Sequence, residues 1–239
     1  MPPTLDAAIS STAERVRLTI YGSFAASGHC ASRADIAAEL QLDAAEVGSA
    51  IDELQTRHHV VLGESGDIVM AHPFSSVNLG FSVMGHDTLW WGGCAWDSFA
   101  IPHLVPTEPS VLVATTCPAC GTAHAWTVDR DAPPEGDQVA HFLVPAARIW
   151  HDVVHTCSNQ RIFCSEACVD DWLYRSGNSR GSSFDLATLW RLAEHWYEGR
   201  LDTPYERRDP VAAAAYFASV GLHGPFWGTP EIAGAPARE

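Results

Sequence analysis

The sequence predicts an α+β fold, in which a winged-helix-like N-terminal domain is followed by a mixed or antiparallel β core with C-terminal helices. Three observations predict it: capped helical patterns before residue 58, short β-rich runs between residues 74 and 150, and further helical patterns after residue 165. The 239 residues are 46% hydrophobic and 18% charged, which is typical of a globular protein. We expect an N-terminal domain over 11–73, a core domain over 74–228 and a loose tail over 229–239.

Three helices and a hairpin account for the N-terminal domain. Apolar residues recur at fourfold spacing in 11–28, and Ser32 and Asp43 stand where N-caps of a second and a third helix are wanted. Residues 59–71 then read as two short strands joined by a turn at "GESG". This order is the outline of a winged helix.

A winged helix can bind DNA, but the charges here oppose that use. The third helix, which would read the bases, carries four acidic residues against Arg57, and the formal net charge of the chain is −15. The same charge disfavours docking on an anionic membrane surface. We therefore interpret the domain as a scaffold and expect neither nucleic acid nor membrane as a partner.

The compartment is expected to be the cytoplasm. The first twenty residues lack the basic start and apolar run of a secretion signal. Three uncharged stretches, 68–86, 109–128 and 210–230, are long enough for a membrane span, but Pro, Gly and polar residues interrupt each one, so we assign them to the core. Seven cysteines, an odd number, fit poorly with a disulfide framework.

The core domain begins with strands and ends with helices. β-rich runs occur at 110–117, 124–130 and 139–145. Helical patterns follow at 165–177, 183–200 and 209–222. In the second of these helices, Leu186, Leu189, Trp190, Ala193, Trp196 and Tyr197 share one face, and Gly199 is expected to end it.

The stretch "GGCAWDSF", residues 92–99, places Cys94 and Asp97 three positions apart among tryptophans. If a helix begins after the two glycines, both side chains share a face, and the helix N-terminus favours the thiolate of Cys94. The surrounding indoles are expected to raise the pKa of Asp97, which suits a carboxyl group that holds and returns a proton. Taken alone, the pair is better explained as a buried cysteine and a surface aspartate.

A second candidate thiol is Cys157, in "VVHTCSN". It lies at least seven positions from any other cysteine, so it is not part of a short chelating loop. The alternative is an ordinary core cysteine at the end of a strand.

Two cysteine pairs have the spacing of a zinc site. Cys117 and Cys120 form a C-x2-C pair, and Cys164 and Cys168 form a C-x3-C pair that enters a predicted helix. Tetrahedral zinc accepts four thiolates, two from each short loop. We favour a structural zinc over four unrelated reduced cysteines. A redox role is weaker, since no βαβ context surrounds the first pair.

The segment "WWGGCAWDSFAIPHL" resembles the alkylmercury lyase (organomercurial lyase) family. That family has an aromatic approach to a cysteine, an aspartate three residues on, and then a proline, which match Cys94, Asp97 and Pro102. Its second cysteine, ahead of a segment similar to "FCSEACVDDW", matches Cys157, and the resemblance covers roughly 12–228. Cys117 falls where the family often has a structural cysteine, whereas the other three cysteines of the two pairs are additional.

The resemblance implies a lyase in which Cys94, Asp97 and Cys157 are catalytic. Mercury(II) is soft and prefers thiolates, so Cys94 and Cys157 would bind it while Asp97 protonates the carbon and releases a hydrocarbon. No organic cofactor is implied. The Hg(II) product would stay on the two cysteines until small thiols or a mercuric reductase remove it, as mercury resistance requires.

Two alternatives stay open from the sequence. One is a non-catalytic protein that binds or senses a soft metal, mercury or copper, although a pure chelator has no need of Asp97. The other is a repurposed enzyme of the lyase fold that acts on another substrate, for which the additional cysteines leave room.

Overall fold

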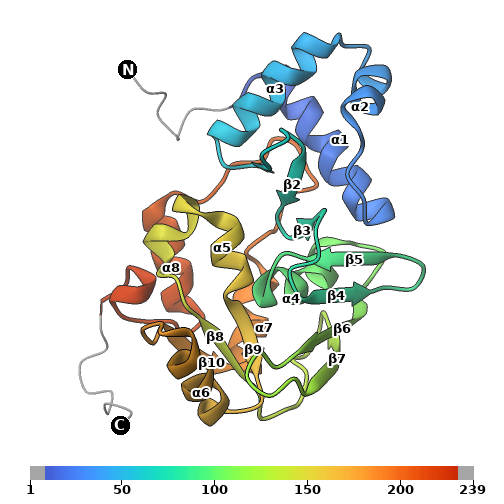
Figure 1. Cartoon of the computed structure of the whole chain (residues 1–239). Helices are drawn as coiled ribbons and strands as arrows, with labels where there is room; N and C mark the ends of the chain where they lie inside the picture. The colour runs from blue at the N-terminus through green and yellow to red at the C-terminus, as the bar shows by residue number, and fades with distance from the viewer. Residues whose placement is uncertain (1–8, 231–239) are drawn as a thin grey trace.

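The computed structural model describes residues 9–230 and has an α+β architecture of two antiparallel sheets and surrounding helices (Figure 1). Most of the tail expected over 229–239 lies outside the described residues. Among the helices within 9–230, none combines the length and the hydropathy that a membrane crossing requires.

The N-terminal helices are α1 (Ser11–Ser27), α2 (Arg33–Leu40) and α3 (Ala44–Thr56). Both predicted caps are confirmed. Ser32 and Asp43 each accept hydrogen bonds from the first turn of their helix, and an acidic side chain three residues on closes a capping box in both cases. Buried apolar residues of the three helices pack against one another and join the main core of the molecule.

The expected hairpin is the beginning of a seven-stranded antiparallel sheet with the order β1-β2-β3-β5-β4-β6-β7. Its strands are β1 (Val61–Leu62), β2 (Ile68–Ala71), β3 (Phe74–Ser75), β4 (Phe81–Met84), β5 (Leu89–Gly92), β6 (Ser110–Thr116) and β7 (Ala123–Asp129). Met70 of β2 pairs with Ser75 of β3, so one sheet runs from the helical part into the core. Figure 1 shows β2 and β3 leading from the three helices to the rest of the sheet.

A smaller sheet has the order β10-β8-β9, and helices fill the space around both sheets. Its strands are β8 (Val139–Phe142), β9 (Gln160–Phe163) and β10 (Ser182–Asp185). The remaining helices are α4 (Ala95–Leu104), η1 (Ala146–His151), α5 (Val153–Ser158), α6 (Glu166–Ser176), α7 (Leu186–Glu194), α8 (Pro210–Ser219) and η2 (Pro225–Trp227). Helix α4 packs against α7 and against β4, β5 and β6, and all of its residues except His103 are buried. The centre of the fold is therefore helix α4.

The helix predicted over 183–200 is shorter than expected. Its first residues form β10, Asp185 caps α7, and the helix ends at Glu194 instead of continuing to Gly199. The apolar face of α7 is buried as predicted, but the chain turns after Glu194. Beyond the end of the helix, the hydroxyl of Tyr197 donates to Asp97 in α4, a tertiary contact that local periodicity cannot reveal.

Gly28 provides a test of how closely the N-terminal helices approach the sheet. It ends α1 with φ of 74°, and a Cβ there would overlap the carbonyl oxygen of Leu89 in β5. Gly177 ends α6 with φ of 69° and has open space around it. We expect Gly177→Ala to lower the free energy of unfolding by about 1 kcal/mol and Gly28→Ala by about 2–4 kcal/mol, measured by urea unfolding. Equal losses in the free energy of unfolding would contradict the close approach of α1 to β5 at Gly28.

Candidate active site

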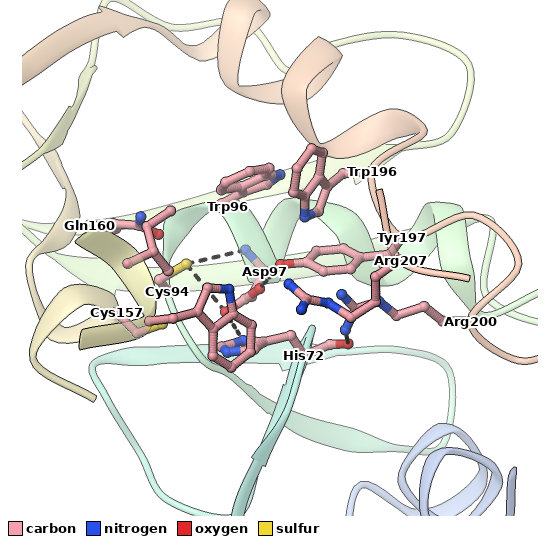
Figure 2. A pocket seen from close by; sticks show the side chains of 12 residues that line it. His72, Cys94, Trp96, Asp97, Cys157, Gln160, Trp196, Tyr197, Arg200 and Arg207 are labelled. Atoms are coloured by element: carbon pink, nitrogen blue, oxygen red, sulfur yellow. Dashed lines mark hydrogen bonds and ion pairs between the residues drawn. The ribbon is translucent and has the colours of Figure 1, made fainter. Parts of the chain in front are cut away.

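Two thiols and a carboxylate meet in a buried cavity of about 60 Å³ at the start of α4 (Figure 2). Cys94 is the N-cap of α4, Asp97 lies in its first turn, and Cys157 lies near the end of α5. Cys94 and Asp97 are each 1% exposed and Cys157 is 3% exposed. The three residues singled out in the sequence are thus brought together, and Cys157 stands on a short helix rather than at the end of a strand.

The helix predicted to begin after Gly92 and Gly93 is confirmed. Position 93 requires a glycine because a Cβ there would overlap Oδ2 of Asp97. The hydroxyl of Ser98 donates to the carbonyl of Cys94 at 2.7 Å, and the Asp97 N–H donates to Cys94 Sγ at 3.5 Å. The first turn of α4 therefore holds the thiol and the carboxylate against each other.

Asp97 accepts hydrogen bonds on both carboxylate oxygens. Cys94 Sγ lies 3.2 Å from Oδ2, and Nδ1 of His72 lies 3.1 Å from the same oxygen. The hydroxyl of Tyr197 donates to Oδ1. The ligand atoms of His72, Asp97 and Cys157 all lie within 4.8 Å of one another. Partners from three separate segments thus converge on a single buried carboxylate.

The thiols are held in their protonated form. Burial raises the pKa of Cys94 well above its ordinary value, and the hydrogen bond with Cys157 and the charge of Asp97 raise it further. For Cys157, the hydrogen bond with Cys94 lowers the pKa, but burial and Asp97 together raise it more. The expectation that the helix N-terminus favours the thiolate of Cys94 is wrong in its net effect. The Asp97 N–H does lower that pKa, but desolvation outweighs it.

Arg200 connects the supports of the carboxylate. Its guanidinium donates to the Tyr21 hydroxyl at 3.0 Å, to the His72 carbonyl at 2.7 Å and to the Tyr205 hydroxyl at 3.0 Å. It also lies over the ring of Tyr197, 4.6 Å from the centroid. Because Arg200 is only 4% exposed, these contacts replace its solvation and fix His72 and Tyr197 together. Sequence reasoning missed His72, Tyr197 and Arg200 as site residues, since none of them stands in a motif.

Aromatic side chains wall the cavity, but only part of the expected cluster does so. Trp96, Trp196 and Tyr197 line it, with Trp96 and Trp196 packed at 4.7 Å between centroids. Trp90 faces away, because its indole N–H donates to the carbonyl of Phe24 in α1 at 2.7 Å. The neighbouring Trp residues in the sequence therefore divide between the site and the packing of the N-terminal helices.

The four cysteines of the predicted metal site form a second cluster. Cys117 and Cys120 lie in the turn between β6 and β7, Cys164 follows β9, and Cys168 lies in α6. Their sulfur atoms all lie within 4.8 Å of one another. A tetrahedral zinc with bonds of about 2.3 Å places its sulfurs about 3.8 Å apart. Cys120 Sγ and Cys164 Sγ are 3.4 Å apart, so only small shifts of the sulfurs are needed to hold one.

Comparisons with known proteins identify the family and the fold. A family model described as alkylmercury lyase matches residues 74–198, a range that includes Cys94, Asp97, Cys157 and Tyr197. A solved structure described as the mercury-bound form of MerB2 is similar with a TM-score of 0.60 and 17% sequence identity, over 79% of this chain and 91% of that chain. No curated protein is similar enough to count as a match.

The protonation of Cys94 can be tested by alkylation of the metal-free protein with iodoacetamide, quantified for each cysteine by mass spectrometry. Because the pKa of Cys94 is raised, we expect its rate to climb about tenfold per pH unit from pH 7 to 9. Hydrogen bonds from Thr122 lower the pKa of Cys120 to about 6, so its rate should be nearly constant over this range. A plateau for Cys94 below pH 8 would contradict the assignment.

Proposed function

The chain belongs to the alkylmercury lyase family and is an enzyme that breaks carbon–mercury bonds; we propose that Cys94, Asp97 and Cys157 carry out the reaction. The observation that supports this assignment most is the hydrogen bond between the buried Cys94 and Asp97, beside the buried Cys157 in the same cavity. Two soft ligands are needed to hold the metal, and one acid is needed to supply a proton to the carbon.

The proton balance of the reaction follows from the protonated thiols. As Cys94 sulfur bonds to the mercury of R–Hg–X and displaces X, its proton passes to Asp97, which lies 3.2 Å away. Cys157 adds as the second sulfur ligand, and its proton leaves with X as HX. Asp97 then protonates the carbon, and the electron pair of the carbon–mercury bond forms the new C–H bond. The hydrocarbon R–H departs, and Hg(II) stays on the two sulfurs.

The raised pKa of each thiol suits this order of reaction steps. A soft metal displaces the proton of a thiol that water at neutral pH does not deprotonate, so the proton is released only when the substrate binds. His72 and Tyr197 keep the carboxylate aimed at the sulfurs throughout. The aromatic walls exclude water, which would otherwise compete as a proton source, and offer an apolar surface to R.

The remaining assignments concern partners and domains. We assign small thiols or a mercuric reductase as the acceptor of Hg(II), with no organic cofactor and with the cytoplasm as the compartment. Residues 11–73 serve as a winged-helix-like scaffold for the core of 74–228, without nucleic-acid or membrane binding. The contacts of Arg200 with α1 support this role, since they reach the site from the helical part.

Cys117, Cys120, Cys164 and Cys168 are assigned to a structural zinc. The support is the convergence of four sulfurs from two loops that are distant in sequence. The zinc would join the β6–β7 turn to the start of α6, at a surface where Cys120 is exposed and few apolar residues are buried.

Hydrocarbon release tests the catalytic residues. With phenylmercury and excess thiol, we expect the protein to yield benzene, measured by gas chromatography. Cys94→Ser and Cys157→Ser each remove a soft ligand and should bring benzene below detection. Asp97→Asn should still bind mercury but release benzene about 10²–10⁴-fold more slowly, because the proton donor is lost. Cys30→Ser is the control, and normal turnover in either cysteine variant of the site would eliminate the mechanism.

Elemental analysis of the purified protein tests the zinc site. We expect about one zinc per chain, and loss of that zinc in the double variant Cys117→Ser/Cys164→Ser. The matched control, Cys94→Ser/Cys157→Ser, removes two thiols from the other cluster and should keep the metal. Zinc that persists in the first variant would show that these cysteines are not its ligands.

A further inference from the structure

The cavity around Cys94 and Cys157 is small for the substrates of a carbon–mercury lyase. Its volume is about 60 Å³, whereas a dry protein cavity that binds benzene measures about 150 Å³. An aryl or longer alkyl group needs room beyond the present walls.

Such room lies on the other side of Trp150. A larger hollow of about 370 Å³, which we call the outer groove, runs between β1 and α5. Its walls combine apolar side chains with polar ones: Val60, Val61, Leu62, Val153 and Val154 on the one hand, and Gln55, His58, His151 and Asp152 on the other. Trp150 lines both this groove and the active-site cavity, so its indole is the shared wall between them.

Ring contacts hold the Trp150 indole where it is. Trp150 is half-buried and belongs to η1, a short 3-10 helix with no buried residue and no side-chain cap. The ring of His58 stacks on it at 4.2 Å and 6° between planes. The guanidinium of Arg207 lies 4.7 Å from its centroid, and His72 meets it edge-on at 6.0 Å. Turning the indole away therefore breaks these ring contacts and its packing on the edge of the main core, but moves no fully buried residue of η1.

The backbone of His58 supports the importance of this stack. His58 is a non-glycine residue with φ of 60°, a left-handed conformation that residues with a Cβ seldom adopt because the Cβ crowds the backbone. In this conformation, the flat ring of His58 stacks on the Trp150 indole. Strain that is kept at the edge of a site points to a function for the contact that it maintains.

We propose that Trp150 is a gate between the active-site cavity and the outer groove, and that organic groups larger than methyl extend past it into the outer groove. This inference rests on the lyase function proposed above and specifies its substrate range. Substrates with small alkyl groups are cleaved while the Trp150 indole keeps its position. Larger groups displace the indole and pack on the valine and leucine side chains behind it, so Trp150 determines how far the enzyme favours small substrates.

The test compares methylmercury with phenylmercury, followed as methane and benzene. We expect Trp150→Ala to raise the ratio of kcat/KM for phenylmercury over methylmercury by about tenfold, since no indole has to be displaced. His58→Ala should shift the ratio in the same direction by a smaller factor, because the indole remains but loses its stack. Trp172→Ala, at a half-buried tryptophan beside the other cysteine cluster, is the control and should leave the ratio unchanged.

A second variant should change the kcat/KM ratio in the opposite direction, which a general loosening of the site would not do. Val154 lines the outer groove and is 38% exposed, so Val154→Trp fills the groove at a position that tolerates a larger side chain. We expect it to lower the same ratio by about tenfold. An unchanged ratio in Trp150→Ala would overturn the gate. A wild-type protein that releases neither methane nor benzene would instead overturn the lyase assignment, so the two failures are distinguishable.

Discussion

The buried carboxylate of Asp97 is the constraint on which the rest of the structure depends. Removing such a charge from water costs several kcal/mol unless hydrogen bonds replace the solvation. The partners come from three places: Cys94 at the start of α4, His72 after β2, and Tyr197 in the turn after α7. The fold must bring these segments together before the carboxylate can be buried. Arg200 completes the arrangement by bonding His72 and α1 at once, which makes the N-terminal helices part of the support of the site.

The same burial sets the chemistry of the thiols. A reactive cysteine in many enzymes is activated by a lowered pKa, and the position of Cys94 at a helix N-terminus suggested that pattern. Here desolvation and the nearby carboxylate raise the pKa instead. For the cleavage of a carbon–metal bond this is an advantage, because the reaction consumes a proton at carbon. A thiol that keeps its proton until a soft metal arrives supplies that proton at the right place.

Local patterns in the sequence sufficed for the helix caps, for the start of α4 and for the four-cysteine cluster, because each depends on residues within a few positions or on ligand spacing. The pairing of Cys157 with Cys94 came from the family resemblance, since no local rule joins residues 63 positions apart. His72, Tyr197 and Arg200 escaped prediction because their roles arise only from tertiary contacts. The periodic pattern also overestimates the length of α7: it continues to Tyr197, whereas the helix ends at Glu194 and Tyr197 bonds Asp97 from the turn that follows.

The two sulfur clusters of this chain differ in the groups beside the sulfurs, and that difference separates a metal-holding site from a metal-cleaving one. In the four-cysteine cluster, hydrogen bonds from Thr122 lower the pKa of the exposed Cys120 to about 6, whereas burial raises the pKa of Cys164 to about 12. Cys94 and Cys157 are buried next to Asp97, and their pKa values are raised. Four sulfurs with no carboxylate among them can hold a metal ion, whereas thiols beside the carboxylate of Asp97 can pass a proton through it to carbon. The carboxylate, rather than the number of sulfurs, is therefore what makes the buried cluster suited to catalysis.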